Sequence, residues 1–342
     1  MIINRLEKKI ISILSDFLDY GGNTKICLKR NSSSINMFAD AEVVLFGQQM
    51  LKNFEMRTIS YRSLASRQRF TLLICILSEI HNLLLTQCYC TYRELYYRNS
   101  ELANCQLKVQ RAVNDVCYVL KTTFWNLGVF ASSKGLMAGS LHIYMSNGDI
   151  INCKAPCFMP TNFTYIDHFE TTASFILLVE KDTIFEKMLS FRIFSLIHEN
   201  IILVTGRGYP DVASRWILQR LQREHGLSTY MLADADPCGI EIMLIYRYGS
   251  LAQASNALQL TCPRLKWLGI HPSDLKYLSI PTEPFILNDC RKLESLLRRK
   301  YIDSSVRQEL YILKRDCRKA KLDNMMFLCD YVINKIKRQI VI

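Results

Sequence analysis

Long apolar runs, signal-like segments and stretches rich in glycine or proline are scarce in this 342-residue sequence. The longest unbroken apolar run, Leu72 to Leu77, is far shorter than the ~18 residues that a bilayer-spanning helix needs. Charged residues occupy positions 5, 7, 8 and 9, where a signal peptide would have an apolar core. Only 13 glycines and 8 prolines occur, whereas 49% of the residues are hydrophobic, so disordered and collagen-like chains are excluded. We expect a folded, soluble, intracellular protein with no membrane partner.

Cysteines at zinc-binding spacing are also missing, although the sequence holds 13 cysteines. No Cys-x-x-Cys occurs, and the nearest approaches, Cys88/Cys90 and Cys153/Cys157, have no matching second pair of Cys or His. An odd number of cysteines in a chain without a secretory signal argues against a disulfide framework. We therefore expect reduced core thiols and no structural zinc.

Acidic residues are in deficit. The sequence has 31 Asp plus Glu against 43 Lys plus Arg, a formal net charge of +12. From residue 291 to residue 342, 14 basic and 6 acidic residues leave a net charge of +8. This excess favours a polyanionic partner, nucleic acid first, although a basic run can also be an ordinary solvated surface.

The first 20 residues space apolar side chains three and four positions apart, with charged and polar residues between them. This pattern predicts an amphipathic helix. Gly21, Gly22 and Asn23 end the helix, and a polar segment follows it. The apolar face of such a helix docks either on the protein's own core or in a groove of a partner.

Helical patterns follow over residues 63–87 and 107–120, with a short helix between them. Thr91 and Glu94 form a capping-box pair, so the short helix is expected to begin at Thr91 and to carry Tyr97 near its end. Residues 141–153 predict a β-hairpin that turns at Asn147-Gly148. Three helices followed by a β-ribbon are typical of a winged helix-turn-helix.

The second half changes to short apolar runs that alternate with helical patterns. The predicted strands cover residues 172–179, 200–204 and 228–232. The predicted helices cover residues 183–197, 211–225 and 240–248. This alternation predicts an α/β domain on a mostly parallel sheet. Such sheets bind their ligands at the carboxyl ends of the strands.

Three carboxylates stand at the ends of two predicted strands. Glu180 ends the first strand, and Asp234 and Asp236 follow the third. Carboxylates held this close repel one another, and Mg²⁺, which prefers oxygen ligands, is the usual remedy. The alternatives are that Asp234 caps the next helix and that Glu180 pairs with Lys181 or an arginine.

Two further features carry weaker signals. The Gly206-Arg207-Gly208 loop and a helix capped by Asp211 suit a phosphate, but tight strand-to-helix turns use the same residues for structural reasons. Tyr97 becomes a nucleophile only if a base removes its proton and a cation such as Arg93, one turn earlier, stabilises the transition state. Otherwise a tyrosine at helical spacing is a core or surface residue.

The sequence closely resembles the type IIB topoisomerase A-subunit family, whose motifs occur here in the family's order. The matching segments are 91–97, 132–139, 179–182, 204–211 and 234–239, and 267–274 extends the match. The resemblance covers roughly residues 63–301. The family includes the A subunit of archaeal topoisomerase VI and the eukaryotic meiotic proteins that start recombination by breaking DNA.

The resemblance implies an α/β plus winged-helix fold. It places an N-terminal helix and partner-docking segment at 1–60, a winged-helix (CAP-like) DNA-binding domain at 61–155, and a Toprim α/β domain with a C-terminal extension at 169–342. Tyr97, assisted by Arg93, would attack the DNA backbone to give a 5′-phosphotyrosyl link and a free 3′-hydroxyl. The implied Mg²⁺ ligands are Glu180, Asp234 and Asp236. The basic residues that we expect to contact DNA are Lys134, Lys108, Arg111 and Arg207.

The resemblance also implies partners. A homodimer would share active sites, with Tyr97 of one protomer facing the three carboxylates of the other. Type IIB topoisomerases are of the ATP-hydrolysing class, but no ATPase motif is recognisable here, so strand passage would need a separate topoisomerase VI B-like subunit. The residues expected to dock it are Ile3, Leu6, Ile10, Ile13 and Phe17.

The cysteine content and the loose fit of the C-terminal part to the archaeal pattern favour the meiotic branch. This predicts meiotic DNA double-strand-break formation on chromosomes in the nucleus, with accessory recombination proteins. Lys321 departs from the acidic residue expected after Lys319-Ala320. The alternatives are a topoisomerase VI A subunit in strand passage and a cleavage-inactive DNA-binding scaffold. A lost tyrosine or carboxylate would have favoured the scaffold, and none is lost; the motif order around Tyr97 disfavours a Toprim nuclease or primase.

Overall fold

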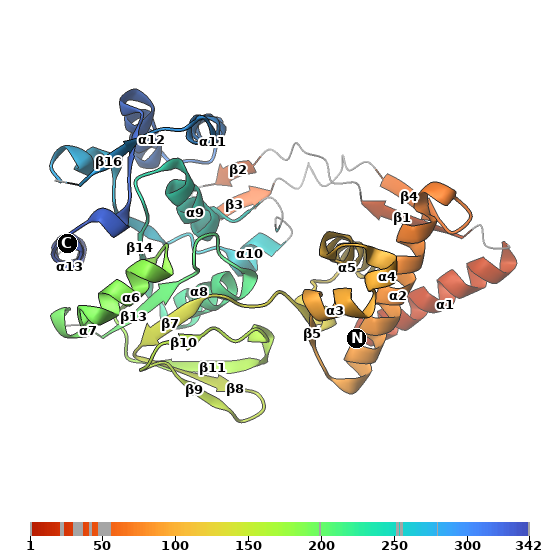
Figure 1. Cartoon of the computed structure of the whole chain (residues 1–342). Coiled ribbons are helices and arrows are strands. Elements are labelled where there is room, and N and C mark those ends of the chain that lie inside the picture. The colour runs from red at the N-terminus through yellow and green to blue at the C-terminus, as the bar shows by residue number, and fades with distance from the viewer. Residues whose placement is uncertain are drawn as a thin grey trace. The chain divides into compact units, whose positions relative to one another are not determined.

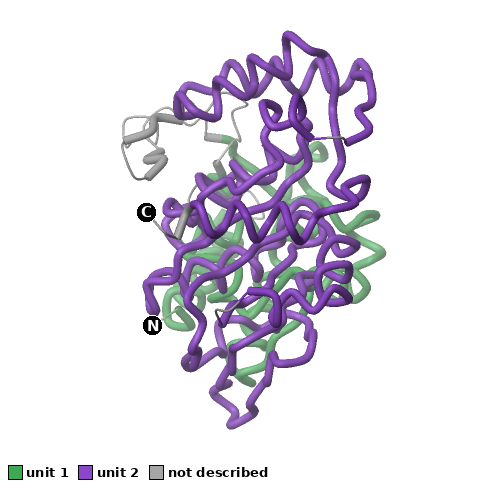
Figure 2. The backbone as a smooth tube through the Cα atoms, turned by 90° about the vertical axis from the view of Figure 1, so that its left-hand side faces the viewer, with its two compact units in different colours: residues 1–35, 48–132 green, residues 36–47, 133–342 purple. Residues whose placement is uncertain are grey.

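The computed structural model describes residues 2–20, 24–29, 37–40, 43–46, 56–197, 200–250, 253, 256–278 and 280–340. The chain forms two compact units (Figure 2). Unit 1 comprises residues 1–35 and 48–132, and unit 2 comprises residues 36–47 and 133–342. Tyr97 therefore belongs to unit 1, whereas the predicted metal ligands belong to unit 2.

Unit 1 is built mainly from helices (Figure 1). These are α1 (Ile2–Asp19), α2 (Leu64–Thr86), α3 (Tyr92–Arg98), α4 (Ser100–Ala103) and α5 (Gln106–Leu120). α2 packs against α1 and α5, and its buried side chains include Phe70, Leu73, Ile76, Leu77 and Ile80. The helices predicted over the first 20 residues and over 63–87, 91–97 and 107–120 are confirmed.

α2 is the one helix in the described part of the chain that is long and apolar enough to cross a membrane. Core helices pass the same test of length and composition. Ile76 and Ile80 of α2 are fully buried inside unit 1, so the middle of the helix contributes to the core.

The strands of unit 1 were not predicted. β1 (Lys25–Lys29) pairs antiparallel with β4 (Met56–Ser60), and Ile26 lies opposite Ile59. Ile26 and Leu28 are buried while Lys25 and Cys27 are exposed, which is the alternation of a half-buried strand. Polar residues lie next to β1 in the sequence, and for this reason a polar segment was predicted here instead of a strand. Two shorter strands, β5 (Cys90–Thr91) and β6 (Val129–Phe130), pair in parallel next to η2 (Trp125–Leu127).

Unit 2 is organised around a six-stranded sheet with the order β10-β7-β13-β12-β14-β15. The strands are β7 (Leu136–Gly139), β10 (Cys157–Phe158), β12 (Phe175–Val179), β13 (Ile201–Thr205), β14 (Ser228–Leu232) and β15 (Lys266–Gly269). β13, β12, β14 and β15 run parallel, and β7 and β10 add antiparallel pairs. The three predicted strands and the mostly parallel sheet are confirmed.

The register of this sheet positions the candidate site. Val179 lies opposite both Thr205 and Leu232, so β12, β13 and β14 end at the same level. Glu180, the loop after β13 and Asp234 consequently meet at one edge. The helices that connect and follow these strands are α6 (Asp182–Ser190), α7 (Ile193–Leu196), α8 (Val212–His225), α9 (Pro237–Tyr248) and α10 (Ala257–Leu260).

The predicted hairpin forms, but it belongs to unit 2. β8 (Leu141–Met145) and β9 (Ile150–Asn152) are joined through Gly148, whose φ of +89° suits the turn. β8 also pairs with β11 (Ile166–Thr171), after a short η3 (Phe163–Tyr165). The expected domain end at residue 155 therefore differs from the structure, because β11 and the preceding strand β7 hold the ribbon in unit 2. The winged-helix arrangement stays a prediction.

The C-terminal part folds back onto the sheet of unit 2. Its elements are η5 (Pro272–Lys276), β16 (Thr282–Pro284), α11 (Leu287–Leu297), α12 (Ser304–Asp316), β17 (Arg318–Ala320), η6 (Leu322–Asn324) and α13 (Leu328–Ile340). Ala320 bridges to Ala235, just after β14. The hairpin of β2 (Met37–Asp40) and β3 (Val43–Phe46) is also grouped with unit 2, so the segment predicted as 1–60 divides between the units.

Candidate active site

Tyr97 lies on the exposed side of α3. The Glu94 N–H donates to Thr91 Oγ1 at 3.1 Å, and the Thr91 N–H donates to Glu94 Oε2 at 2.8 Å, which confirms the predicted capping box. Tyr92 and Leu95 are buried and anchor the opposite side of the helix. The side chain of Tyr97 is 60% exposed, so its hydroxyl is open to a macromolecular substrate.

Arg93 lies one helical turn before Tyr97 and contacts it directly. Arg93 Nε and Nη2 each donate to Tyr97 Oη at 3.3 Å. The guanidinium carbon is 5.7 Å from the centre of the tyrosine ring. A cationic donor at this oxygen stabilises the negative charge that develops there when the proton leaves. The structure therefore brings together the two residues predicted as catalytic.

The three predicted metal ligands lie after β12 and β14. Glu180 is buried, and its Oε2 accepts the backbone N–H of Asp234 at 2.9 Å. Asp236, rather than Asp234, caps α9, because its Oδ1 accepts the Gly239 N–H at 2.6 Å. A Cβ at position 239 would lie 2.6 Å from the Asp234 carbonyl oxygen and 2.9 Å from Glu180 Oε2, so this close approach requires glycine.

Burial and neighbouring carboxylates raise the pKa values of Glu180 and Asp236. Burial, and then the charges of Asp234 and Asp236, raise the pKa of Glu180 to about 8, against the opposing hydrogen bond from the Asp234 N–H. Burial also raises the pKa of Asp236, again with a contribution from Asp234 and against the hydrogen bond from Gly239. A cation bound here would offset this repulsion.

The negative charge of Asp234 is already paired with a lysine of the same chain. Lys181 Nζ lies 2.6 Å from Asp234 Oδ2, and the Leu322 N–H donates to Asp234 Oδ1 at 2.9 Å. Lys181 also contacts Asp323 Oδ2 at 2.7 Å. Burial alone lowers the pKa of Lys181, but its bonds to Asp234 and Asp323 outweigh this and raise it. Lys181 thus pairs with Asp234, and not with Glu180 as one alternative expected.

The chemistry of the donors fits Mg²⁺. Glu180, Asp234 and Asp236 offer hard oxygen ligands whose charges repel one another. Within the described residues, however, no three His, Cys, Asp or Glu side chains are already grouped as a metal site. Asp234 faces Lys181 and Leu322 instead. Coordination by all three carboxylates, which would require Asp234 to leave these partners, stays a proposal.

Replacing Lys181 with methionine is expected to destabilise the metal-free protein by about 3–5 kcal/mol, because the buried Asp234 carboxylate loses its counter-charge. Unfolding in the presence of EDTA measures this effect, and the exposed Lys314, changed to methionine, is the control. Added Mg²⁺ should stabilise the Lys181 variant more than the wild type, since no ammonium competes for Asp234. Coinciding unfolding curves for the two variants would contradict this role of Lys181.

The loop after β13 is held by a set of hydrogen bonds. Asp211 Oδ1 accepts the Ser214 N–H at 2.7 Å and caps α8, as predicted. Asp211 Oδ2 accepts the Lys134 N–H at 2.7 Å, and Lys134 Nζ donates to the Arg207 carbonyl oxygen at 3.2 Å. Arg207 in turn forms an ion pair with Asp182 at 2.9 Å. Two of the predicted DNA-contacting residues, Lys134 and Arg207, therefore lie together in unit 2.

The other two predicted DNA contacts lie in unit 1. Lys108 and Arg111 are on α5, where Arg111 is exposed and Lys108 is half-buried. Lys108 Nζ donates to Gln68 Oε1 at 3.4 Å. The four predicted DNA-contacting residues are thus divided between the units, and their role stays a prediction.

The predicted docking face of α1 is partly wrong. Leu6 and Ile13 are buried in the core of unit 1, where α1 packs against α2 and α5. Phe17 contacts the ring of Tyr61, with the ring centres 5.7 Å apart. Ile3 and Ile10 are half-buried. Buried side chains cannot contact a partner, so Leu6 and Ile13 do not belong to the docking face.

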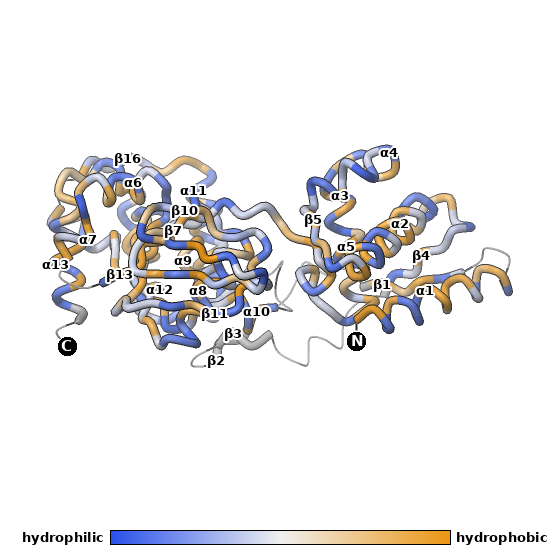
Figure 3. Tube along the Cα trace, turned by 90° about the horizontal axis from the view of Figure 1, so that it is seen from below, coloured by the Kyte–Doolittle hydropathy of each residue, from blue (hydrophilic) through white to orange (hydrophobic). Residues whose placement is uncertain are grey.

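A different stripe of α1 is exposed. Ile11, Leu14 and Leu18 are 61%, 56% and 81% exposed, and their spacing of three and four places them along one side. Figure 3 shows hydrophobic and hydrophilic residues alternating along α1. The helix therefore carries apolar residues on two sides, and its sequence pattern does not reveal which of them packs inside.

An ionic network around the buried Glu241, near the loop, was not predicted from the sequence. Glu241 on α9 accepts the Tyr209 hydroxyl and Lys292 Nζ, each at 2.5 Å, and also pairs with Arg299. These bonds tie the 206–211 loop to α9 and α11. Lys292 and Arg299 follow Glu241 by 51 and 58 residues, so no local motif links them.

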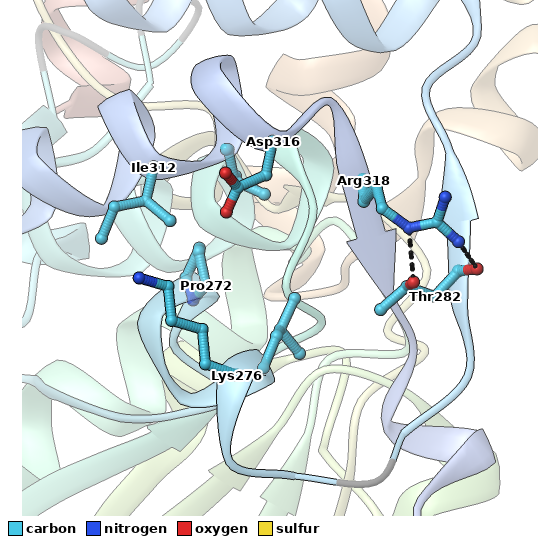
Figure 4. Close-up of a pocket in the computed structure, with 8 residues that line it drawn as sticks. Pro272, Lys276, Thr282, Ile312, Asp316 and Arg318 are labelled. Carbon is cyan, nitrogen blue, oxygen red and sulfur yellow. Dashed lines mark hydrogen bonds between the residues drawn. The ribbon is translucent and has the colours of Figure 1, made fainter.

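A surface pocket in the C-terminal part of unit 2 is separate from these features (Figure 4). Its lining residues are Pro272, Leu275, Lys276, Thr282, Ile312, Leu313, Asp316 and Arg318. Arg318 is engaged there, since it donates to Thr282 Oγ1 at 2.6 Å and to the Thr282 carbonyl oxygen at 2.8 Å. None of the predicted site residues lines this pocket.

Two protein-family models match the chain. The model for the Toprim domain of the topoisomerase 6 A subunit/Spo11 proteins matches residues 175–337, which include all three carboxylates, and confirms the predicted Toprim domain. The model for type IIB DNA topoisomerases matches residues 68–129, which include Arg93 and Tyr97.

Known proteins are similar over most of the chain. Meiotic recombination protein W68 of Drosophila melanogaster is 38% identical over 98% of this chain and 97% of its own length. Meiotic recombination protein SPO11 of Homo sapiens is 36% identical over 85% of this chain and 77% of its own. The A subunit of DNA topoisomerase 6 from Arabidopsis thaliana is 32% identical over 77% of this chain and 63% of its own.

Proposed function

The chain belongs to the family of Spo11 and the topoisomerase 6 A subunit, and we propose that it forms DNA double-strand breaks in meiotic recombination by topoisomerase-like transesterification. The observation that supports the proposal is the exposed Tyr97, whose hydroxyl oxygen accepts hydrogen bonds from Arg93 Nε and Nη2. W68 and human SPO11 have higher identity and fuller coverage than the topoisomerase 6 A subunit, which favours this role over that of a topoisomerase 6 subunit. ATP hydrolysis is not assigned to this polypeptide.

In the proposed reaction, Tyr97 Oη loses its proton and attacks a backbone phosphorus of double-stranded DNA. The new bond joins Tyr97 to the 5′-phosphate, and the broken bond releases a 3′-hydroxyl that takes up a proton. One phosphodiester replaces another, so the cleavage step needs no nucleotide. Arg93 stabilises the charge on the attacking oxygen and on the phosphate next to it.

Glu180, Asp234 and Asp236 would hold Mg²⁺. The bound ion would supply Lewis-acid stabilisation of the charge on the scissile phosphate and the leaving oxygen. Around it, the Gly239 N–H orients Asp236 and the Asp234 N–H orients Glu180. Lys134 and Arg207 would contact DNA phosphates, which position the duplex without reading its bases, so sequence selectivity is expected to be weak.

We further propose a homodimer with shared active sites, in which Tyr97 of one copy acts with the three carboxylates of the other. Breaking both strands needs two nucleophiles, and each chain supplies one. Accessory recombination proteins and a topoisomerase VI B-like subunit would join this dimer on chromosomes in the nucleus.

The exposed stripe of α1 is the proposed contact for the B-like subunit. Changing Leu14 to serine is expected to weaken binding of this partner at least about tenfold while leaving the melting temperature unchanged, because Leu14 is exposed. Changing Leu6 to alanine is expected to destabilise unit 1 by about 2–5 kcal/mol, because Leu6 is fully buried. Binding measured by calorimetry, together with thermal unfolding, separates the two effects, and unaltered affinity in the Leu14 variant would move the contact elsewhere.

Covalent trapping tests the proposed function. The purified chain, with a B-like subunit where one is found, is incubated with duplex DNA and Mg²⁺, denatured, and digested to identify the amino acid linked to DNA. We expect a 5′-phosphotyrosyl adduct at Tyr97. Linkage to another residue would overturn the assignment of Tyr97, and absence of any adduct while DNA binding persists would favour a cleavage-inactive scaffold.

The topoisomerase 6 role is the second candidate, because the relative of that name matches 77% of the chain. Relaxation of supercoiled DNA by the chain with ATP and a B-like subunit distinguishes the candidates. Breaks without relaxation favour the recombination role.

A further inference from the structure

Two cysteines of unit 2 lie against each other at a junction between its sheets. Cys153 follows β9 of the three-stranded sheet, and Cys157 begins β10 of the six-stranded sheet. Their Sγ atoms are 3.4 Å apart, and only Lys154, Ala155 and Pro156 separate them in the chain. The other close pair in the sequence, Cys88 and Cys90, differs: Cys88 Sγ points to the Thr86 carbonyl oxygen at 3.5 Å.

Backbone hydrogen bonds and strand pairing fix the positions of both cysteines. The Cys153 N–H donates to the Leu141 carbonyl oxygen at 2.9 Å, and the Cys153 carbonyl oxygen accepts the Gly139 N–H at 2.7 Å. Cys157 pairs with Met137 in the ladder between β10 and β7. A disulfide needs the sulfurs about 2.05 Å apart, so they have to close by roughly 1.4 Å, which side-chain rotation can supply.

The two thiols differ in exposure and in proton affinity. Cys153 is fully buried, whereas Cys157 is partly exposed. The hydrogen bond between them lowers the pKa of Cys157 and, together with burial, raises the pKa of Cys153. The accessible sulfur is therefore the one that more readily becomes a thiolate, the form that reacts with oxidants.

We propose that Cys153 and Cys157 are a redox-responsive pair that forms an intrachain disulfide when a peroxide is present. The Cys157 thiolate attacks one peroxide oxygen, breaks the O–O bond and becomes a sulfenic acid, while the other oxygen leaves as hydroxide and is protonated to water. The Cys153 sulfur then attacks the Cys157 sulfur, the S–O bond breaks and a second water leaves. Two thiols are oxidised and one hydrogen peroxide is reduced to two waters.

The bond would cross-link the three-stranded and six-stranded sheets of unit 2 through side chains. β7, to which β10 is paired, begins two residues after Lys134, and the Gly135 carbonyl oxygen accepts the Met159 N–H at 3.0 Å. Oxidation would thus limit movement of the strand that leads out of the Lys134 loop. This inference concerns thiols outside the proposed active site and does not depend on the proposed function.

Peptide mapping after mild oxidation tests the pair. The reduced full-length protein is treated with hydrogen peroxide, free thiols are blocked with N-ethylmaleimide under denaturing conditions, and the protein is digested with trypsin without reductant. Cleavage after Lys154 places the two cysteines in different peptides, 135–154 and 155–181. We expect these peptides as one linked species that separates on reduction, while Cys88 and Cys90, which share the tryptic peptide 70–93, both carry N-ethylmaleimide.

The Cys157→Ser variant is the matched control and should show no linked species, with its circular dichroism spectrum unchanged. Complete alkylation of Cys153 after a peroxide treatment strong enough to oxidise the exposed Cys105 would overturn the proposal. So would a link from Cys153 to a cysteine other than Cys157.

Discussion

Replacing Tyr97 with phenylalanine is expected to reduce the covalent protein–DNA product roughly 10³-fold or more, that is, below detection. The change removes one oxygen, and that oxygen is the atom to which Arg93 donates twice. The ring, the capping box of α3 and the buried anchors Tyr92 and Leu95 all remain. DNA binding and the melting temperature are therefore expected to match the wild type.

Tyr96 provides the control for this experiment. It neighbours Tyr97, with ring centres 5.5 Å apart, but it is less exposed and no bond from Arg93 to it is found in the structure's described residues. Tyr96→Phe should keep most of the covalent product. If the product survives in Tyr97→Phe and disappears in Tyr96→Phe, the nucleophile has been misassigned by one residue.

Replacing Glu180 with glutamine is expected to reduce Mg²⁺-dependent cleavage about 10²-fold or more while making the metal-free protein more stable at alkaline pH. Burial and neighbouring carboxylates raise the pKa of Glu180 to about 8, from an ordinary value of 4.5. Between these pH values the folded protein binds a proton that the unfolded chain does not, so stability falls as pH rises through this window. Glutamine stays neutral and can still accept the Asp234 N–H through its amide oxygen.

Thermal unfolding in EDTA checks the sign of this effect. At pH 4.5 the glutamine variant and the wild type should unfold at similar temperatures, and the advantage of the variant should grow with pH until it melts a few degrees higher at pH 8.5. Adding Mg²⁺ should raise the melting temperature of the wild type only. The exposed Glu186 on α6, changed to glutamine, is the control, and a Glu180 variant that is less stable at both pH values would contradict the assigned cause.

The sequence predicts what depends on neighbours in the chain. The capping box of Thr91 and Glu94, the cap by Asp211 and the apolar strands are short-range signals, and the structure contains each of them. The meeting of Glu180 with Asp234 was also predictable, because parallel strands of similar length end at a common edge.

Contacts between distant segments were beyond such reasoning. Lys181 binds Asp323, 142 residues later, and no local pattern marks the two as partners. The packed side of α1 depends on which of its two apolar stripes meets α2, and the ribbon of β8 and β9 is placed by its pairing with β11. In each case the structure is determined by burial against, or strand pairing with, a segment outside the local sequence pattern.

The return of the C-terminal segment to β14 has a consequence for synthesis. Asp234 receives the Leu322 N–H, which lies 88 residues further along the chain, and the cation that neutralises it is steadied by Asp323. During translation the strand that leads to Asp234 is made long before these residues leave the ribosome. A nascent or prematurely terminated chain that ends before residue 322 therefore carries a carboxylate without its backbone donor. The edge that carries Glu180 and Asp234 is completed only after residues 322 and 323 have been made.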